Sequence, residues 1–305
     1  MNSNTDIWLN RVSTVLGLIE KLASLPVDLL EKLEHTLPLS IRQRLQDFYQ
    51  QSGEDATDPF GMDYKSIRAT LSVTAFFYTY YFRCQTTGIE KVPEGPVILA
   101  ANHAGQLPID AIMVSTALFL EPTPPIVCRS MMDRLVPTLP LISTWYNRLG
   151  VVLGTSDNAE YLLNSGQKLL TFPEGVRGIQ KPISKAYELQ KFGLGFIRLA
   201  LKNHTPIIPV SIVGSEEQYP TLYNIERGTH LLNVPSIPIW LQMPVPILGL
   251  LPLPVRYYIH FGEPMMFKGD PDDDDEVIAP MAETVKIAIN DEINRLRTQR
   301  KGIFQ

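Results

Sequence analysis

The chain has 305 residues, of which 45% are hydrophobic and 19% charged, and its formal net charge is −5. So large an apolar share needs a folded core, which excludes a disordered chain. The negative balance excludes a nucleic-acid binder that acts through bulk positive charge, so no nucleic-acid partner is expected. The only two cysteines, Cys84 and Cys128, exclude a disulfide framework and predict reduced thiols in a reducing compartment.

The first fifty residues are predicted to be helical. Their N-terminal part does not have the pattern of a secretory signal or a transit peptide, so neither is expected. Apolar residues recur at helical spacing over 9–25 and again over 29–37, and Pro26 and Pro38 divide the segment because proline breaks helices. Ser40 is expected to cap a third helix. This region either caps the core, lies on a membrane surface or forms an interface with another chain, and all three interpretations remain open.

Beyond this region the pattern predicts an α/β fold with a mixed, partly parallel central sheet flanked by helices. Residues 64–83 are expected to form an aromatic-rich helix, which polar residues interrupt too often for a membrane span. The expected strands lie at 96–101, 126–128, 151–153, 168–172, 207–213 and 256–261. The expected helices include one with Met113 and Leu118 and others at 158–167, 189–203 and 276–299.

Residues 228–255 contain no charged side chain, but their six prolines argue against a membrane helix. We predict an irregular apolar loop that packs on the core or dips into a bilayer surface, with Trp240 at the interface. The acidic run 270–276 lacks the glycine and spacing of an EF-hand loop. Its carboxylates are instead expected at the start of the helix 276–299, where they complement the helix macrodipole.

The segment Asn102-His103 directly follows the expected strand 96–101, and strand ends are where α/β folds place ligand sites. Gly105 allows a tight backbone path before the first turn of a helix that would hold Asp110. A carboxylate that holds one imidazole nitrogen leaves the other nitrogen free to take a proton. From these residues alone, His103 is either a general base for a hydroxyl or a structural histidine.

The segment FPEGVRG, residues 172–178, follows a second buried strand. Two glycines, Gly175 and Gly178, lie beside an acid and a base, Glu174 and Arg177. Such a turn can present backbone amides and a guanidinium to an anion, because arginine binds phosphate in a forked geometry. The alternative interpretation is a structural Glu–Arg pair within a turn.

Taken together, NHAGQLPID and FPEGVRG resemble the first and third signatures of the glycerolipid acyltransferase superfamily, which includes lysophosphatidate acyltransferases. The strand IIPVSI, with its central Pro209, is similar to the fourth block of that family, and RLGVVLG at 148–154 is similar to the second. The resemblance covers roughly residues 88–265. It implies a region of N-terminal helices at 1–57, followed by an acyltransferase domain at 58–305.

Six residues separate His103 from Asp110, where the family usually has four. This longer loop is similar to the branch of diacylglycerol and monoacylglycerol acyltransferases, and DPFG at 58–61 and VGSEE at 213–217 resemble the same branch. The second block lacks an arginine after Gly150, which in the family helps to hold the acceptor's phosphate. The resemblance therefore favours an uncharged acceptor or a lysophospholipid over a glycerol phosphate.

The resemblance implies that a fatty acyl group moves from an acyl thioester to a lipid hydroxyl, with His103 as general base and Asp110 fixing its tautomer. Backbone amides near Gly105 or Gly175 are expected to stabilise the oxyanion. No cofactor, metal or covalent acyl-enzyme is required. The implied substrate-binding residues are Asn102, Gly105, Glu174, Gly175, Arg177 and Pro209.

The expected partners are acyl-coenzyme A or acyl carrier protein as donor and a lipid acceptor at a membrane surface. We therefore predict a cytoplasmic protein that associates peripherally with membranes. Two alternatives differ in class. A serine hydrolase would need the pattern G-x-S-x-G, and the nearest match, Val213-Gly214-Ser215-Glu216-Glu217, lacks the final glycine. A non-catalytic lipid-binding protein that retains the fold is the other.

Overall fold

The chain folds into two compact units. One comprises the described part of Met1–Phe77 together with Met132–Leu153, and the other comprises Tyr78–Met131 and Gly154–Gln305. This division groups residues 58–77 with the N-terminal helices, whereas the sequence predicts a boundary after residue 57. The helix expected at 9–25 lies outside the described residues. The computed structural model describes residues 27–51, 57–105, 107–132, 142–225, 237–245, 249 and 251–305.

The first unit is helical, as the sequence predicts for its N-terminal part. Helices α2, α3 and α6 all contact α4, and Ser72 on α4 donates a 2.5 Å hydrogen bond to Glu34 on α2. Asp63 caps α4, because its side chain accepts the amide of Ser66 at 2.7 Å. The elements are α2 (Val27–Thr36), α3 (Leu39–Gln51), α4 (Tyr64–Phe76), α6 (Ile142–Arg148) and the short strand β4 (Val152–Leu153).

The predicted cap at Ser40 is wrong. Helix α3 begins one residue earlier, at Leu39, and the carbonyl of Pro38 accepts the amides of Ile41 and Arg42. Pro38 therefore occupies the N-cap position, and Ser40 lies inside the first turn of the helix.

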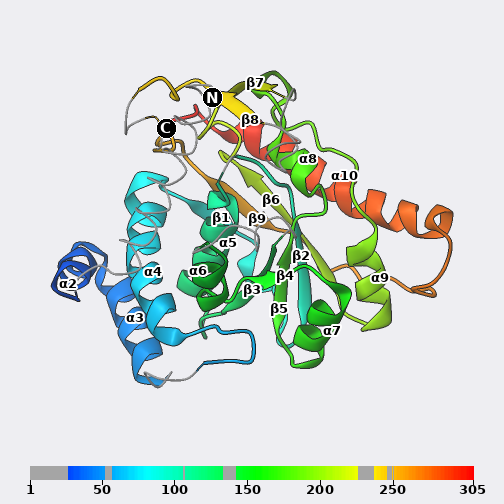
Figure 1. Cartoon of the computed structure of the whole chain (residues 1–305), viewed down its shortest axis with the longest axis horizontal. Coiled ribbons are helices and arrows are strands. Elements are labelled where there is room, and N and C mark those ends of the chain that lie inside the picture. Colours follow the sequence, from blue (N-terminus) through cyan, green and yellow to red (C-terminus); the bar gives the residue numbers. More distant parts are fainter. Residues whose placement is uncertain are drawn as a thin grey trace, which may run out of the picture. The chain divides into compact units, whose positions relative to one another are not determined.

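The second unit contains six of the seven strands of the main sheet, in the order β1-β9-β6-β2-β5-β3 (Figure 1). Strand β2 pairs in parallel with both β5 and β6, whereas β9 is antiparallel to β6 and parallel to β1. The predicted mixed, partly parallel sheet is therefore confirmed. The strands are β1 (Gln85–Thr87), β2 (Val97–Ala101), β3 (Cys128–Met132), β5 (Lys168–Thr171), β6 (Ile207–Val213) and β9 (Tyr258–Phe261).

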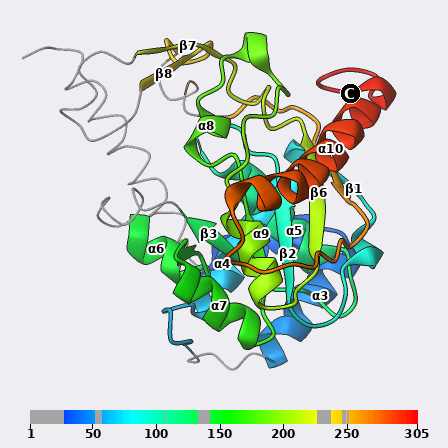
Figure 2. The same cartoon turned by 90° about the vertical axis from the view of Figure 1, so that its right-hand side faces the viewer.

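Helices cover both faces of this sheet, which buries every residue of β2 and β6. On one face α7 (Ser156–Asn164) contacts α9 (Gly195–Lys202), and α9 contacts α10 (Asp275–Gln299), which packs along β6 (Figure 2). Helix α5 (Ile109–Leu120) joins β2 to β3 and so runs along the sheet in one direction. Helix α9, which joins β5 to β6, runs along it in the other direction. Right-handed crossovers therefore place α5 on the other face.

Part of the prediction for residues 228–255 is wrong. Residues Ile237–Trp240 form β8, which pairs antiparallel with β7 (Thr221–Ile225) in a separate two-stranded sheet. Pro238 is tolerated in β8, because each strand of a two-stranded sheet has one unpaired edge. The Trp240 indole donates to the carbonyl of Gly249 at 2.8 Å. The described residues beyond β8 form turns and irregular backbone, as predicted.

The aromatic segment continues α4 as a π-helical turn, Phe77–Tyr81, in which Tyr78 is buried and Tyr80 is exposed. The Tyr78 hydroxyl donates to Glu121 at 2.9 Å, and burial raises the pKa of Tyr78 above its ordinary value. Within the described ranges, no helix is both long and apolar enough to cross a membrane.

Candidate active site

Two neighbouring strands deliver the candidate site to one edge of the sheet. Strands β2 and β5 pair in parallel with Ala100 opposite Thr171, so the segments that follow them leave the sheet side by side. The segment after β2 carries His103, and the segment after β5 carries Glu174. This is the carboxyl edge of the sheet, where open α/β folds bind ligands.

His103 and Asp110 form a close pair at this edge. Helix α5 begins at Ile109, so the longer loop lies before the helix and Asp110 falls in its first turn. The Asp110 carboxylate is fully buried; its Oδ2 lies 2.6 Å from His103 Nδ1 and also accepts the amide of Ala104 at 3.0 Å. When Nδ1 donates to this carboxylate, Nε2 keeps a lone pair that can accept a proton.

The imidazole ring and the backbone of His103 are each held by a further contact. It stacks on Phe172, with ring centroids 4.1 Å apart and planes 28° apart. Gly178, in the short helix α8 (Val176–Ile179), lies so close that a Cβ atom there would come within 2.9 Å of the His103 carbonyl oxygen. The His103 side chain is 16% exposed, so the ring is packed in place but still reachable from solvent.

The Glu174 carboxylate is buried and fixes the backbone beneath the imidazole. Its Oε1 accepts the amide of His103 at 3.0 Å, and its Oε2 accepts the amide of Gln190 at 2.7 Å. Both oxygens of Glu174, which is predicted to bind substrate, are thus bonded to the chain itself. Glu174 positions the residue that carries the imidazole.

A buried lysine compensates this carboxylate. Lys181 Nζ lies 2.6 Å from Glu216 Oε1 and 3.5 Å from Glu174 Oε2, and its side chain is only 3% exposed. Burial raises the pKa of Glu216 to about 7, although the Lys181 ammonium acts in the opposite direction. One cation thus holds two carboxylates from different loops, and one of those carboxylates holds His103.

A second cluster ties the end of α10 to the turn after β6. Tyr187 donates a short hydrogen bond to Glu217, and its hydroxyl accepts the amide of Gly214 at 2.8 Å. Arg300 Nη2 lies 2.6 Å from Glu217 Oε1, and the Arg297 guanidinium stacks over the Tyr187 ring at 4.7 Å. Burial raises the pKa of the Tyr187 hydroxyl well above its ordinary value, so the hydroxyl stays protonated.

Comparison with known proteins identifies the family. A family model described as Acyltransferase matches residues 83–213. An uncharacterized protein of Mycobacterium tuberculosis is 35% identical over 272 residues, which cover 87% of this chain and 74% of that protein. The human protein named "DGAT1/2-independent enzyme synthesizing storage lipids" is 26% identical over 215 residues, 68% of this chain and 61% of that protein.

The fold agrees with a solved acyltransferase. The crystal structure of the 1-acyl-sn-glycerophosphate (LPA) acyltransferase PlsC from Thermotoga maritima superposes with a TM-score of 0.50 and 17% identity, covering 78% of this chain and 82% of that one. The chain belongs to the glycerolipid acyltransferase superfamily. Its α/β sheet with flanking helices is the acyltransferase fold.

Two of the other expected substrate-binding residues of this acyltransferase are structural. Asn102 is fully buried, and its amide group both donates to the carbonyl of Ile212 at 3.0 Å and accepts the amide of Ile212 at 2.7 Å. It therefore ties the end of β2 to β6. Pro209 is buried inside β6, opposite Ala100, and its carbonyl accepts the amide of Gly262 at 2.9 Å.

Gly105 and Gly175, the two predicted donors to the oxyanion, differ in whether their backbone amides are already hydrogen-bonded. Gly105 and Gly175 both have positive φ, +88° and +58°, which favours glycine at each. The Gly175 amide donates to the carbonyl of Phe172 at 2.9 Å and is therefore unavailable to a substrate. The Gly105 amide has no hydrogen-bond partner in the part of the chain that the structure describes. Of the two, Gly105 can therefore offer a donor.

Arg177 is exposed and donates through Nη2 to the carbonyl of Lys191 at 2.9 Å. Its guanidinium keeps its charge and further N–H groups for an anion. Arg148, from the second block, ends α6 in the other unit, where its Nε lies 3.9 Å from Asp63 Oδ2.

Sequence reasoning missed three residues of the site: Lys181, Glu216 and Gln218. Gln218 is fully buried, and its Oε1 accepts the Tyr257 hydroxyl at 2.7 Å. Its Nε2 has no partner among the described residues and lies 2.6 Å from where a Cβ atom on Gly105 would be. The VGSEE pattern pointed to this turn without indicating a role for any of its side chains.

Proposed function

We propose that this acyltransferase moves a fatty acyl group from an acyl thioester, of coenzyme A or of acyl carrier protein, to a lipid hydroxyl. His103 is the general base. The observation that carries the proposal is the 2.6 Å contact between His103 Nδ1 and buried Asp110 at the carboxyl edge of the sheet. That contact orients the ring and leaves Nε2 for the acceptor hydroxyl.

The proposed reaction needs one base and no covalent enzyme intermediate. Nε2 of His103 takes the proton of the acceptor hydroxyl as its oxygen attacks the thioester carbon. Asp110 stabilises the imidazolium that forms. When the tetrahedral intermediate collapses, the carbon–sulfur bond breaks and the imidazolium returns the proton to the leaving thiolate. An ester and a free thiol result.

The Gly105 amide is the candidate donor for the oxyanion in this mechanism. It follows His103 by two residues and has no partner among the described residues. A preorganised donor at the developing negative charge stabilises the transition state more than the ground state. The Gly175 amide, the other candidate from the sequence, is already bonded to Phe172.

We propose an uncharged acceptor such as a diacylglycerol, or a lysophospholipid. The second block carries no arginine after Gly150, and the loop between His103 and Asp110 is long. The similarity to proteins named for synthesizing storage lipids supports an acceptor of this class.

We also propose that the acyltransferase meets its acceptor at a membrane surface through the ribbon β7–β8. This ribbon begins three residues after Gln218 and exposes Leu222 (50%) and Tyr223 (56%), and Leu241 (59%) is exposed directly after β8. Exposed apolar side chains of this size bind the boundary of a bilayer. Leu222→Asp is expected to reduce co-sedimentation with phosphatidylcholine vesicles, while Ile287→Asp, at a similarly exposed position on α10, is the matched control. Equal co-sedimentation of both variants and wild type would contradict this role.

The test of the proposed reaction is an acyl-transfer assay with a panel of acceptors. Labelled acyl-coenzyme A and acyl carrier protein are offered with diacylglycerol, a lysophospholipid, lysophosphatidate and a fatty alcohol. We expect transfer to diacylglycerol or the lysophospholipid, and we expect His103→Ala to lose it. His35→Ala, which changes an exposed histidine on α2, is the control and should retain it. Efficient transfer to lysophosphatidate contradicts the acceptor class. Lipid binding without transfer to any acceptor identifies a non-catalytic lipid-binding protein.

A further inference from the structure

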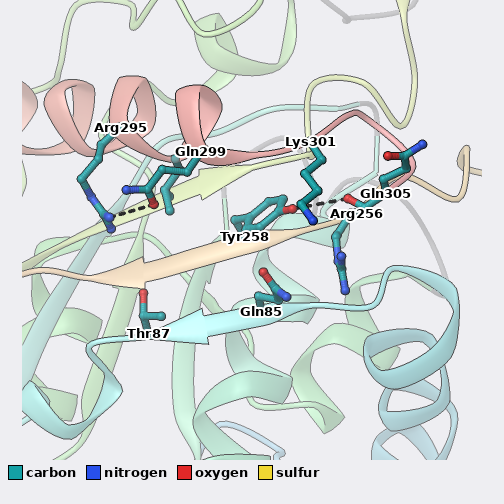
Figure 3. A pocket seen from close by; sticks show the side chains of 9 residues that line it. Gln85, Thr87, Arg256, Tyr258, Arg295, Gln299, Lys301 and Gln305 are labelled. Carbon is teal, nitrogen blue, oxygen red and sulfur yellow. Dashed lines mark hydrogen bonds between the residues drawn. The ribbon is translucent and has the colours of Figure 1, made fainter.

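A pocket lies on the same unit as the candidate active site, between β1, β9 and the C-terminal end of α10 (Figure 3). Its volume is about 450 Å³. Three of its nine lining side chains are cationic, namely Arg256, Arg295 and Lys301, and none is acidic. Five of the other six carry amide or hydroxyl groups and the sixth is Leu296, so polar groups predominate in the lining.

Two of the three cations have no neutralising partner. Arg295 is paired with Glu292, its Nε donating to Oε2 at 2.7 Å. Arg256 donates only through Nε to the carbonyl of Arg83 at 3.4 Å, and within the described ranges neither Arg256 nor Lys301 has a carboxylate within ion-pair distance. In a chain of net charge −5, this is a local positive site.

The donor set suits a phosphate group. The Arg256 guanidinium keeps a terminal fork of N–H groups, which matches phosphate oxygens, and the Lys301 ammonium adds a point charge. Figure 3 shows both side chains at one end of the pocket, beside Tyr258 and Gln305. The amide side chain of Gln85 lies below them on the edge strand.

The sheet register places this pocket at the same edge as His103. His103 follows β2, and the side chain of Asn102 binds the backbone of Ile212 in β6. In the next strand, β9, Ile259 pairs with Ile212 and Tyr258 pairs with Val213. Two strand spacings separate β2 from β9 and three separate it from β1, so the pocket lies about 10–15 Å across the sheet from β2, the strand that His103 follows.

We propose that this pocket binds the phosphate groups of the acyl-thioester donor. This inference rests on the proposed function, because it takes the donor to be an acyl thioester on a phosphate-bearing carrier. In coenzyme A and in acyl carrier protein alike, the pantetheine arm separates the thioester from phosphate. A phosphate site at the same sheet edge, but displaced from the imidazole, anchors the carrier while the arm brings the thioester to His103.

The first test measures binding of coenzyme A to the full chain by titration calorimetry. Lys301→Glu is the main variant, because no hydrogen bond of the Lys301 ammonium to the described chain is lost. We expect its Kd for coenzyme A to rise about tenfold, the size of one charged contact, and to rise further in Arg256→Gln/Lys301→Glu. Lys268→Glu, an exposed lysine elsewhere with the same charge change, is the matched control and is expected to bind as wild type does.

The same variants are compared with two further probes, inorganic phosphate and phosphatidylcholine vesicles that contain phosphatidylglycerol. We expect phosphate to compete with coenzyme A in wild type and to compete less in Lys301→Glu. A loss confined to vesicle binding would assign the pocket to a lipid headgroup and overturn the donor proposal. Unchanged affinity for coenzyme A in both variants would also overturn it.

Kinetics separate this proposal from the reaction itself. In Lys301→Glu we expect the KM for acyl-coenzyme A to rise about tenfold with kcat unchanged, since the pocket binds a non-reacting part of the donor. Acyl transfer with an unchanged donor KM would overturn the pocket and leave the reaction standing. Charge-dependent binding of coenzyme A without transfer to any acceptor would contradict the proposed reaction and leave the pocket standing.

Discussion

Two charge clusters lie next to each other at the candidate active site, and they differ in how much of each can meet a substrate. His103 and Asp110 are seven residues apart in the chain, and the imidazole is 16% exposed. Lys181 binds Glu174 and Glu216 from two other loops, and its side chain is 3% exposed. The His103–Asp110 pair offers a ring nitrogen to a substrate. The Lys181 cluster is too deeply buried for a substrate to reach it.

This difference separates the residues proposed to react with substrate from the residues that hold them in place. Glu174 belongs to the most recognisable signature of the sequence, yet its oxygens accept the amides of His103 and Gln190. Lys181 belongs to no signature, yet it compensates that carboxylate. Buried groups that are fully paired fix geometry, and a removed partner leaves an unpaired charge that costs much more than a lost surface contact.

The largest effect is expected when the His103–Asp110 pair, here called the open pair, is broken. His103→Ala removes the proposed base, so kcat is expected to fall by about a thousandfold or more. The free energy of unfolding should fall as well, because the ring stacks on Phe172 and its removal leaves the buried Asp110 carboxylate with only the Ala104 and Ala111 amides. Steady-state acyl transfer and chemical denaturation measure the two effects, and a kcat close to wild type would remove the proposed role.

Asp110→Asn keeps the shape of the pair and removes its charge. We expect kcat to fall by about a hundredfold or more, because the amide no longer holds the tautomer or stabilises the imidazolium. The KM for acceptor should change less than kcat, since Asp110 is buried and has no contact with solvent. Equal kcat in Asp110→Asn and wild type would show that the pair is structural.

Lys181→Met breaks the buried cluster that Lys181 forms with Glu174 and Glu216. It leaves Glu174 and Glu216 buried without their cation, so the free energy of unfolding is expected to fall by about 3 kcal/mol. Below the new melting temperature, kcat should fall more than KM rises, because the backbone amide of His103 loses its fixed acceptor. Lys185→Met, an exposed lysine four residues away, is the control and is expected to match wild type in both measurements.

A smaller effect appears in the pH dependence of stability. Burial raises the pKa of Glu216 from 4.5 to about 7 in the folded chain. The unfolded chain therefore releases this proton at lower pH, and the contribution of Glu216 to stability falls as the pH rises from about 4.5 to about 7. In Glu216→Gln this decline is absent, so Tm should fall less between about pH 5 and about pH 8.

Glu188→Gln, at an exposed position, serves as the control for that measurement. Its Tm is expected to follow the wild-type dependence on pH. Parallel curves for Glu216→Gln and wild type would show that Glu216 titrates in the folded chain as it does in the unfolded chain.

Local patterns were sufficient to predict the sheet and the open pair. Strand β6 occupies the predicted residues 207–213, because an uninterrupted apolar run between turns is typical of a buried strand. The His103–Asp110 contact was predictable since both residues flank one strand-to-helix connection. The start of α9 was not: it was expected at residue 189 and lies at Gly195.

Long-range contacts explain what the sequence could not show. The amides of Gln190 and Gly193 donate to Glu174 and to the carbonyl of Pro173, which holds this segment outside the helix. Lys181 lies in a polar stretch that resembles a surface loop, and its partner Glu216 is 35 residues away. The pairing of β8 with β7 was hidden in the same way, because prolines and apolar residues in that segment predict irregular backbone.

The central claim is that Nε2 of His103 accepts the proton of the acceptor hydroxyl. Its most direct test is the rate of acyl transfer by His103→Ala with and without added imidazole, beside wild type and His35→Ala. We expect that His103→Ala alone loses turnover and that free imidazole restores a measurable part of it. Turnover by His103→Ala at the wild-type rate would contradict the claim.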